Sequence, residues 1–249
     1  MSRNFELLSQ LEGPEENRSA TIAHPPQTAT ADINWKPALR MNDPVRIEVS
    51  RLVDNLFRLQ PSAPRVVAFT APESNVGCSW LCARVAETLA VRVQETICVV
   101  DCNVHSPNIH RQFHIHNHRG LADALNQSEP MRKYVQALSR SNLFVVSGGS
   151  AASNAQSKLV SDGMRERLTE LKELFDYLVL DIASLDISRD AMILGRWTDG
   201  VVLVLKANFS QRETAHKSLQ DFRAADVAVL GAVLNQRTFP VPARLYKIV

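Results

Sequence analysis

The chain has 249 residues and a nearly balanced charge, with 28 Lys and Arg against 26 Asp and Glu. Hydrophobic residues make up 45% of it, so the composition excludes a wholly disordered chain. A formal net charge of +2 gives no basic surface of the kind that nucleic-acid-binding proteins carry, and we therefore expect no nucleic-acid partner.

The sequence predicts a cytoplasmic protein. Acidic and polar residues near Met1 interrupt the apolar core that a signal peptide needs, and no stretch approaches about 18 apolar residues, the length of a membrane span. The four cysteines form no CxxC pair and lie within the apolar part of the sequence, which favours reduced thiols over a disulfide framework. They are Cys78, Cys82, Cys98 and Cys102.

Residues 1–44 are expected to lie outside the main domain. A few apolar residues near the start predict a short amphipathic helix, with a frayed terminus as the alternative. The segment that follows is rich in Pro, Thr, Ser and Asn without apolar periodicity, which is typical of a linker. From residue 45 to 59 apolar residues recur at helical spacing and stop before Pro61, which predicts a helix. We therefore place the main domain at residues 45–249.

Apolar runs and helical patterns alternate through this domain. Runs rich in Val, Ile and Leu predict strands at 65–70, 96–101, 142–147, 177–181, 201–205 and 228–234. Helical patterns lie between them, at 80–93, 164–174, 189–197 and 212–224. This alternation predicts an α/β fold with a doubly wound, mostly parallel sheet and helices on both faces. In such sheets the ligand lies beyond the carboxyl ends of the strands.

The first strand leads directly into a loop and a helix, which is the setting of a phosphate-binding P-loop. In the loop sequence TAPESNVGCS, Gly77 permits close backbone approach and Ser79 offers a hydroxyl for Mg²⁺. Cys78 occupies the position where a P-loop has its lysine, and a thiol is uncharged near neutral pH unless it is perturbed. Since Cys78 starts a helix, both a reactive thiolate and an inert buried thiol remain open.

Two aspartates follow apolar strands on the same side of the predicted sheet. Asp101 ends the second strand, and Asp181 ends the fourth. Neighbouring carboxylates at strand ends can hold Mg²⁺ and orient a hydroxyl nucleophile. The simpler alternative for both residues is a solvated strand end, just as Ser79 could be only a helix cap.

Residues 45–240 resemble the bacterial tyrosine kinases (BY-kinases) of capsule and exopolysaccharide biosynthesis, which are relatives of the P-loop ATPases of the MinD and ParA type. The resemblance rests on the order and spacing of six segments, at 70–79, 99–110, 120–125, 142–149, 177–181 and 199–205. It implies binding of ATP or ADP with Mg²⁺. It also implies a membrane polysaccharide co-polymerase or activator protein as partner, a place at the inner face of the plasma membrane, and a homo-oligomeric ring.

The resemblance also implies roles for individual residues. Asp101 and Asp181 would be catalytic carboxylates, and together with Ser79 they would hold the metal. Nucleotide contacts would come from Gly77, Cys78, Ser79 and Asn235, of which Asn235 could otherwise be a turn former. The phosphoacceptor would be Tyr246.

Departures from the family pattern concentrate in these same segments. The loop lysine is Cys78, and the second motif, D-x-D-x-R, reads Asp101-Cys102-Asn103-Val104-His105. The ring-forming E-x-x-R-x-x-R survives only partly at 48–54, and a single Tyr246 stands for the C-terminal tyrosine cluster. We therefore expect a catalytically impaired regulator of a membrane polymerisation or export complex. An active tyrosine autokinase and a ParA/MinD-like ATPase are the alternatives.

A cluster of histidines follows the second strand. Since alternating residues of an extended segment point to one side, three of these histidines could converge on a transition metal. A polar surface loop is the alternative explanation. The cluster comprises His105, His110, His114, His116 and His118.

Overall fold

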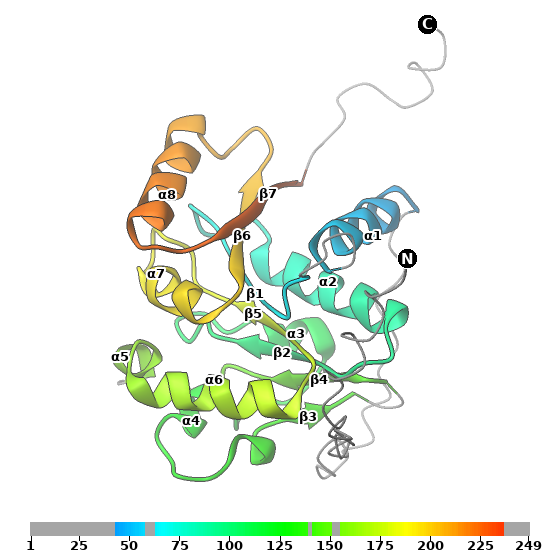
Figure 1. Ribbon diagram of the computed structural model, residues 1–249, viewed down its shortest axis with the longest axis vertical. Coiled ribbons are helices and arrows are strands. Elements are labelled where there is room, and N and C mark those ends of the chain that lie inside the picture. Colours follow the sequence, from blue (N-terminus) through cyan, green and yellow to red (C-terminus); the bar gives the residue numbers. More distant parts are fainter. Residues whose placement is uncertain (1–42, 58–62, 139–140, 151–154, 237–249) are drawn as a thin grey trace, which may run out of the picture.

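The computed structural model describes residues 43–57, 63–138, 141–150 and 155–236 (Figure 1). The predicted short helix and linker therefore lie outside the described residues except for positions 43 and 44, and so does Tyr246. The predicted helix at 45–59 is present as α1 (Asp43–Phe57).

A seven-stranded sheet forms the centre of the molecule, in the order β3-β4-β2-β5-β1-β6-β7. All neighbouring pairs are parallel except β3 and β4. The predicted fold class is confirmed. The strands are β1 (Val66–Thr70), β2 (Ile97–Asp101), β3 (Gln136–Ala137), β4 (Leu143–Val146), β5 (Tyr177–Asp181), β6 (Gly200–Lys206) and β7 (Val229–Asn235).

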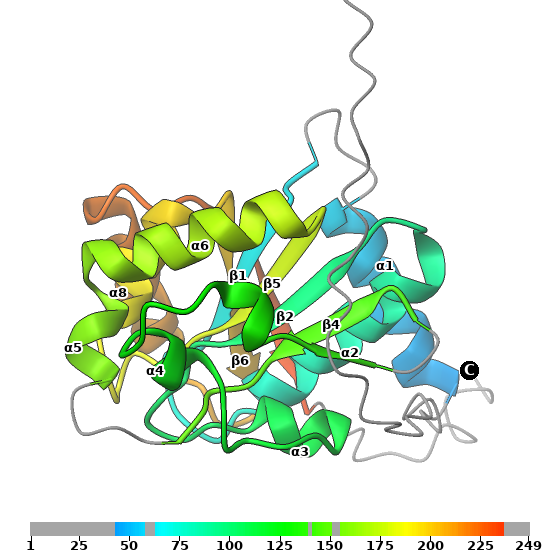
Figure 2. The same ribbon diagram turned by 90° about the horizontal axis from the view of Figure 1, so that it is seen from below.

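Helices cover both faces of the sheet (Figures 1 and 2). One face carries α1, α2 and α3, and the other carries α4 to α8. The bounds are α2 (Cys78–Arg92), α3 (Ile109–Phe113), α4 (Leu121–Ala124), α5 (Ala155–Leu159), α6 (Asp162–Leu174), α7 (Asp190–Leu194) and α8 (Arg212–Ala224), with 3₁₀ turns η1 (Met131–Lys133) and η2 (Gly195–Trp197).

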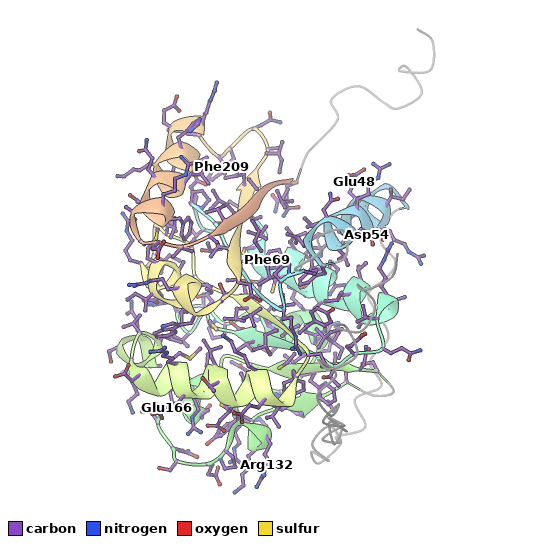
Figure 3. The ribbon with its side chains drawn as sticks, in the orientation of Figure 1. Glu48, Asp54, Phe69, Arg132, Glu166 and Phe209 are labelled. Atoms are coloured by element: carbon purple, nitrogen blue, oxygen red, sulfur yellow. The ribbon has the colours of Figure 1, made fainter. Side chains whose placement is uncertain are left out.

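Burial on both faces explains why the inner strands are continuous apolar runs. In β1, Val66 and Ala68 belong to the core under α6, whereas Val67 and Phe69 belong to the core under α2. Phe69 lies near the middle of the molecule (Figure 3). Because side chains alternate along a strand, a run such as VVAF fills two cores at once. Within the described ranges, no helix combines the length and apolarity that a membrane crossing requires.

Candidate functional site

The loop between β1 and α2 turns tightly just before the start of the helix. Asn75 and Gly77 both have positive φ angles, of 59° and 84°. A Cβ atom on Gly77 would lie 2.6 Å from Nδ2 of Asn235, which itself donates a hydrogen bond of 2.8 Å to the carbonyl of Val76. A side chain at position 77 would therefore have to displace the Asn235 amide, and the φ of 84° itself favours glycine.

A cavity of about 400 Å³ lies at the carboxyl ends of the strands, where the fold predicts a ligand. Its lining residues come from the loop and first turn of α2 (71–80), the segment after β2 (103–108), the segment after β5 (181–187) and Gln236. None of the described residues that line it is a Lys or Arg, whereas Glu73 and Asp181 are carboxylates. The only ionisable acids and bases among these lining side chains are therefore acidic, apart from the Cys78 thiol, and neutral Ser and Asn side chains lie between them.

Asp181 is the most exceptional residue of this cavity. Its side chain is only 1% exposed, and neither carboxylate oxygen has a well-formed hydrogen bond within the described structure. Burial raises the pKa of Asp181 to about 7, although the Ser79 hydroxyl and the Cys78 thiol lie close enough to oppose the rise. Unpaired carboxylate oxygens beside a hydroxyl are a donor set that suits Mg²⁺, so Ser79 and Asp181 fit the predicted metal role.

Asp101 pairs in register with Asp181 across β2 and β5, but its carboxylate is placed differently. It is fully buried and does not line the cavity. One oxygen accepts hydrogen bonds from the backbone N–H groups of Asn108 and Ile109, at 2.9 and 3.0 Å, and the other accepts one from Asn103 at 3.2 Å. Burial, followed by the charge of Asp181, raises the pKa of Asp101, and these N–H groups oppose the rise. In this arrangement Asp101 caps the start of α3.

Cys78 lines the cavity at the position of the missing lysine. Burial raises the pKa of its thiol well above the ordinary value, and the neighbouring Asp181 raises it further. The thiol is therefore protonated at neutral pH, which favours the inert thiol over the reactive thiolate. No fixed positive charge replaces the lysine in the described cavity wall.

Asn235 lies beside the loop and not in the cavity lining. The next residue, Gln236, does line the cavity, and so do Trp80, Asn103 and Asn108. The sequence motifs did not identify these four residues as ligand contacts. The rule that ligands lie beyond the strand ends was a usable signal for Asn103, Asn108 and Gln236, since each follows a predicted strand.

The histidines after β2 do not form a metal centre in the structure. No group of three or more His, Cys, Asp or Glu in the described ranges is arranged to hold a metal ion. The rings of His116 and His118 lie 5.3 Å apart, and His105 is exposed and outside the cavity lining. The structure thus favours the polar surface loop.

In the partial ring motif of α1, Arg51 pairs with Glu48 at 2.8 Å on the exposed side of its own helix.

Comparison with curated proteins gives several tyrosine-protein kinases as relatives. No protein-family model matches the chain. The tyrosine-protein kinase YwqD of Bacillus subtilis is 28% identical over 169 residues, which are 68% of this chain and 71% of that protein. The tyrosine-protein kinase ptk of Acinetobacter johnsonii is 22% identical over 200 residues, 80% of this chain but only 27% of that protein. The chain therefore spans most of the first relative and a small part of the second.

Solved structures show the same fold. The chimerical protein CapA2B2 superposes with a TM-score of 0.75 at 19% identity, covering 81% of this chain and 88% of that chain. The kinase domain of the Escherichia coli tyrosine kinase ETK gives 0.67 at 20% identity, with coverages of 74% and 73%. A chain of the Aquifex aeolicus MinC:MinD cell division protein complex gives 0.59 at 17% identity, with coverages of 70% and 69%. The resemblance to bacterial tyrosine kinases and to the MinD/ParA fold is confirmed.

Proposed function

We propose that the chain is a BY-kinase-like P-loop protein of capsular or exopolysaccharide biosynthesis whose own phosphoryl transfer is impaired. It would be cytoplasmic and act at the inner face of the plasma membrane, through a membrane polysaccharide co-polymerase or activator protein. The observation that carries the impairment is the cavity wall, in which a protonated thiol faces Asp181 and no Lys or Arg is present among the described lining residues.

The retained residues explain what the cavity could still do. Gly77 keeps the backbone open to close approach, and Ser79 and Asp181 would hold Mg²⁺. When bound, Mg²⁺ would partly neutralise the negative charge of a nucleotide's phosphates. Phosphoryl transfer depends mainly on positioning and on stabilising negative charge, so the lost ammonium at position 78 removes a principal contribution. Weak nucleotide binding without efficient transfer is the expected outcome.

The biochemical test uses the full chain with Mg²⁺-ATP. Nucleotide binding by calorimetry, ATP hydrolysis, and phosphotyrosine by mass spectrometry are measured for the wild type, Cys78→Lys and Cys78→Ser. We expect no phosphotyrosine in the wild type or in Cys78→Ser, and tighter nucleotide binding in Cys78→Lys because only lysine restores the charge. Autophosphorylation of the wild type that disappears in Asp181→Asn would refute the impairment.

A genetic test separates regulation from catalysis. If the protein acts through its partner, deletion of its gene in the native host should change the amount or chain length of the surface polymer. Complementation with Asp181→Asn should then restore the wild-type polymer. Complementation by the wild type but not by a stably expressed Asp181→Asn variant would instead indicate that nucleotide chemistry is required.

The second candidate function is an active tyrosine autokinase with an atypical P-loop, which the retained pair of Ser79 and Asp181 favours. In that case Tyr246 is the expected phosphoacceptor, and Tyr246→Phe should abolish the phosphotyrosine signal. A ParA/MinD-like positioning ATPase would hydrolyse ATP without any phosphotyrosine, so the same measurements distinguish it.

A further inference from the structure

A carboxylate of the chain itself is bonded to the phosphate-binding loop. The backbone N–H of Ser74 donates a hydrogen bond of 2.9 Å to Oδ2 of Asp186. Ser74 lies in the middle of the loop between β1 and α2 and lines the cavity. Backbone N–H groups of such loops are the donors with which a P-loop binds anions. One of them is therefore occupied by an internal anion.

The segment after β5 holds Asp186 in this place. Leu185 and Asp186 donate backbone hydrogen bonds to the carbonyls of Ala71 and Pro72, at 2.9 and 3.2 Å, so the segment runs along the start of the loop. The hydroxyl of Ser184 donates a hydrogen bond of 2.5 Å to Oδ1 of Asp186. The two carboxylate oxygens thus have separate donors, which fixes the side chain although it is exposed.

The charge of Asp186 persists at neutral pH. Partial burial would raise the pKa of Asp186, but the hydrogen bonds from Ser184 and Ser74 outweigh it and leave the pKa below the ordinary value. A second carboxylate of the loop, that of Glu73, is held nearby by a hydrogen bond of 2.8 Å from the hydroxyl of Ser210. An approaching phosphate therefore meets fixed negative charge at a loop whose lysine is absent.

We infer that Asp186 is a specificity-determining residue beside the cavity, which disfavours phosphate at the loop by occupying the Ser74 N–H and by fixing a negative charge there. This inference rests on the proposed function, because it supplies a second reason, independent of Cys78, why nucleotide binds weakly. It also assigns a role to a residue outside every motif of the sequence. Removing one negative charge a few ångströms from a bound anion near a protein surface should tighten its binding about tenfold.

The test measures binding of pyrophosphate and of Mg²⁺-ADP to the full chain by calorimetry. Asp186→Asn removes the charge and keeps an acceptor for Ser74, whereas Asp186→Ala removes both. Glu166→Gln is the matched control, since it removes one negative charge from the exposed side of α6, away from the loop (Figure 3). Thermal unfolding of each variant checks that the fold is intact. We expect the affinity for both ligands to be highest in Asp186→Ala, lower in Asp186→Asn, and lowest in the wild type and Glu166→Gln, which should be equal.

The outcomes separate this inference from the proposed function. If neither Asp186 variant binds pyrophosphate at least threefold more tightly than Glu166→Gln, or if none of the proteins binds it at millimolar concentration, the role of Asp186 is refuted. If the wild type already binds Mg²⁺-ADP more tightly than about 100 μM, nucleotide binding is not impaired and the proposed function fails. The comparison among variants remains valid in that case, because it depends only on ratios.

Discussion

Two buried aspartates that face each other in register should respond oppositely to substitution. Asp101→Ala removes the buried acceptor of three backbone N–H groups, of which that of Ile109 is buried and those of Asn103 and Asn108 are half-buried. An unsatisfied buried donor costs about 1–3 kcal/mol and a half-buried one less, so we expect a loss of about 3–5 kcal/mol in the free energy of unfolding. Asp181→Asn breaks no well-formed hydrogen bond and removes a buried charge. It should leave stability unchanged or increase it at pH 8.

Urea unfolding followed by far-ultraviolet circular dichroism measures both effects. The dependence on urea concentration, the m-value, should stay equal among the variants, which shows that the same surface becomes exposed. Asp101→Asn serves as an intermediate variant, because its amide can replace only one of the two accepting oxygens, and it should lose about 1–3 kcal/mol. Equal losses in Asp101→Ala and Asp181→Asn would refute the assignment of one carboxylate to capping and the other to the cavity.

Three further predictions concern the same region. Because the pKa of Asp181 is raised from 3.8 to about 7, the folded state binds its proton more tightly than the unfolded state. The free energy of unfolding should therefore fall as the pH rises from about 4 to 7. Urea titrations at several pH values should show this dependence in the wild type and not in Asp181→Asn. Gly77→Ala should destabilise the protein by about 1–3 kcal/mol, because φ is 84° at this position and the new Cβ atom would lie 2.6 Å from Nδ2 of Asn235. An unchanged melting temperature would contradict this. Cys78 should react with iodoacetamide more slowly than free cysteine at pH 7.5 and faster after Asp181→Asn, and equal rates in both proteins would show that Asp181 does not raise its pKa.

The sheet could be predicted from the sequence because the apolar composition of its strands reflects their burial. The run VVAF at 66–69 in β1 is apolar at every position, and only a strand covered on both faces requires that. The two-residue strand β3 and the short helices α3, α4 and α5 were not predicted, since elements of two to five residues carry no measurable periodicity. Tertiary contacts determine them.

The candidate site was predictable in its position and less so in its details. The loop with Gly77, Cys78 and Ser79 lies at the cavity as the strand, loop and helix order indicates. The difference between Asp101 and Asp181 could not be read from the chain, because both follow an apolar strand in the same way. The difference arises because the N–H groups at the start of α3 lie next to Asp101. Likewise nothing near Asp186 in sequence indicates that its side chain reaches Ser74, which is 112 positions away.

The cap that Asp101 forms on α3 has a consequence for hydrogen exchange. The amide protons of Asn108 and Ile109 are bonded to a side chain and not to a carbonyl of the helix. Their protection from solvent deuterium therefore reports on the carboxylate directly, whereas protection in the strands reports on the opening of the sheet. A ligand that enters beside Asp181 and alters the charge of the pair would change the exchange rates at these two amides before any change of fold.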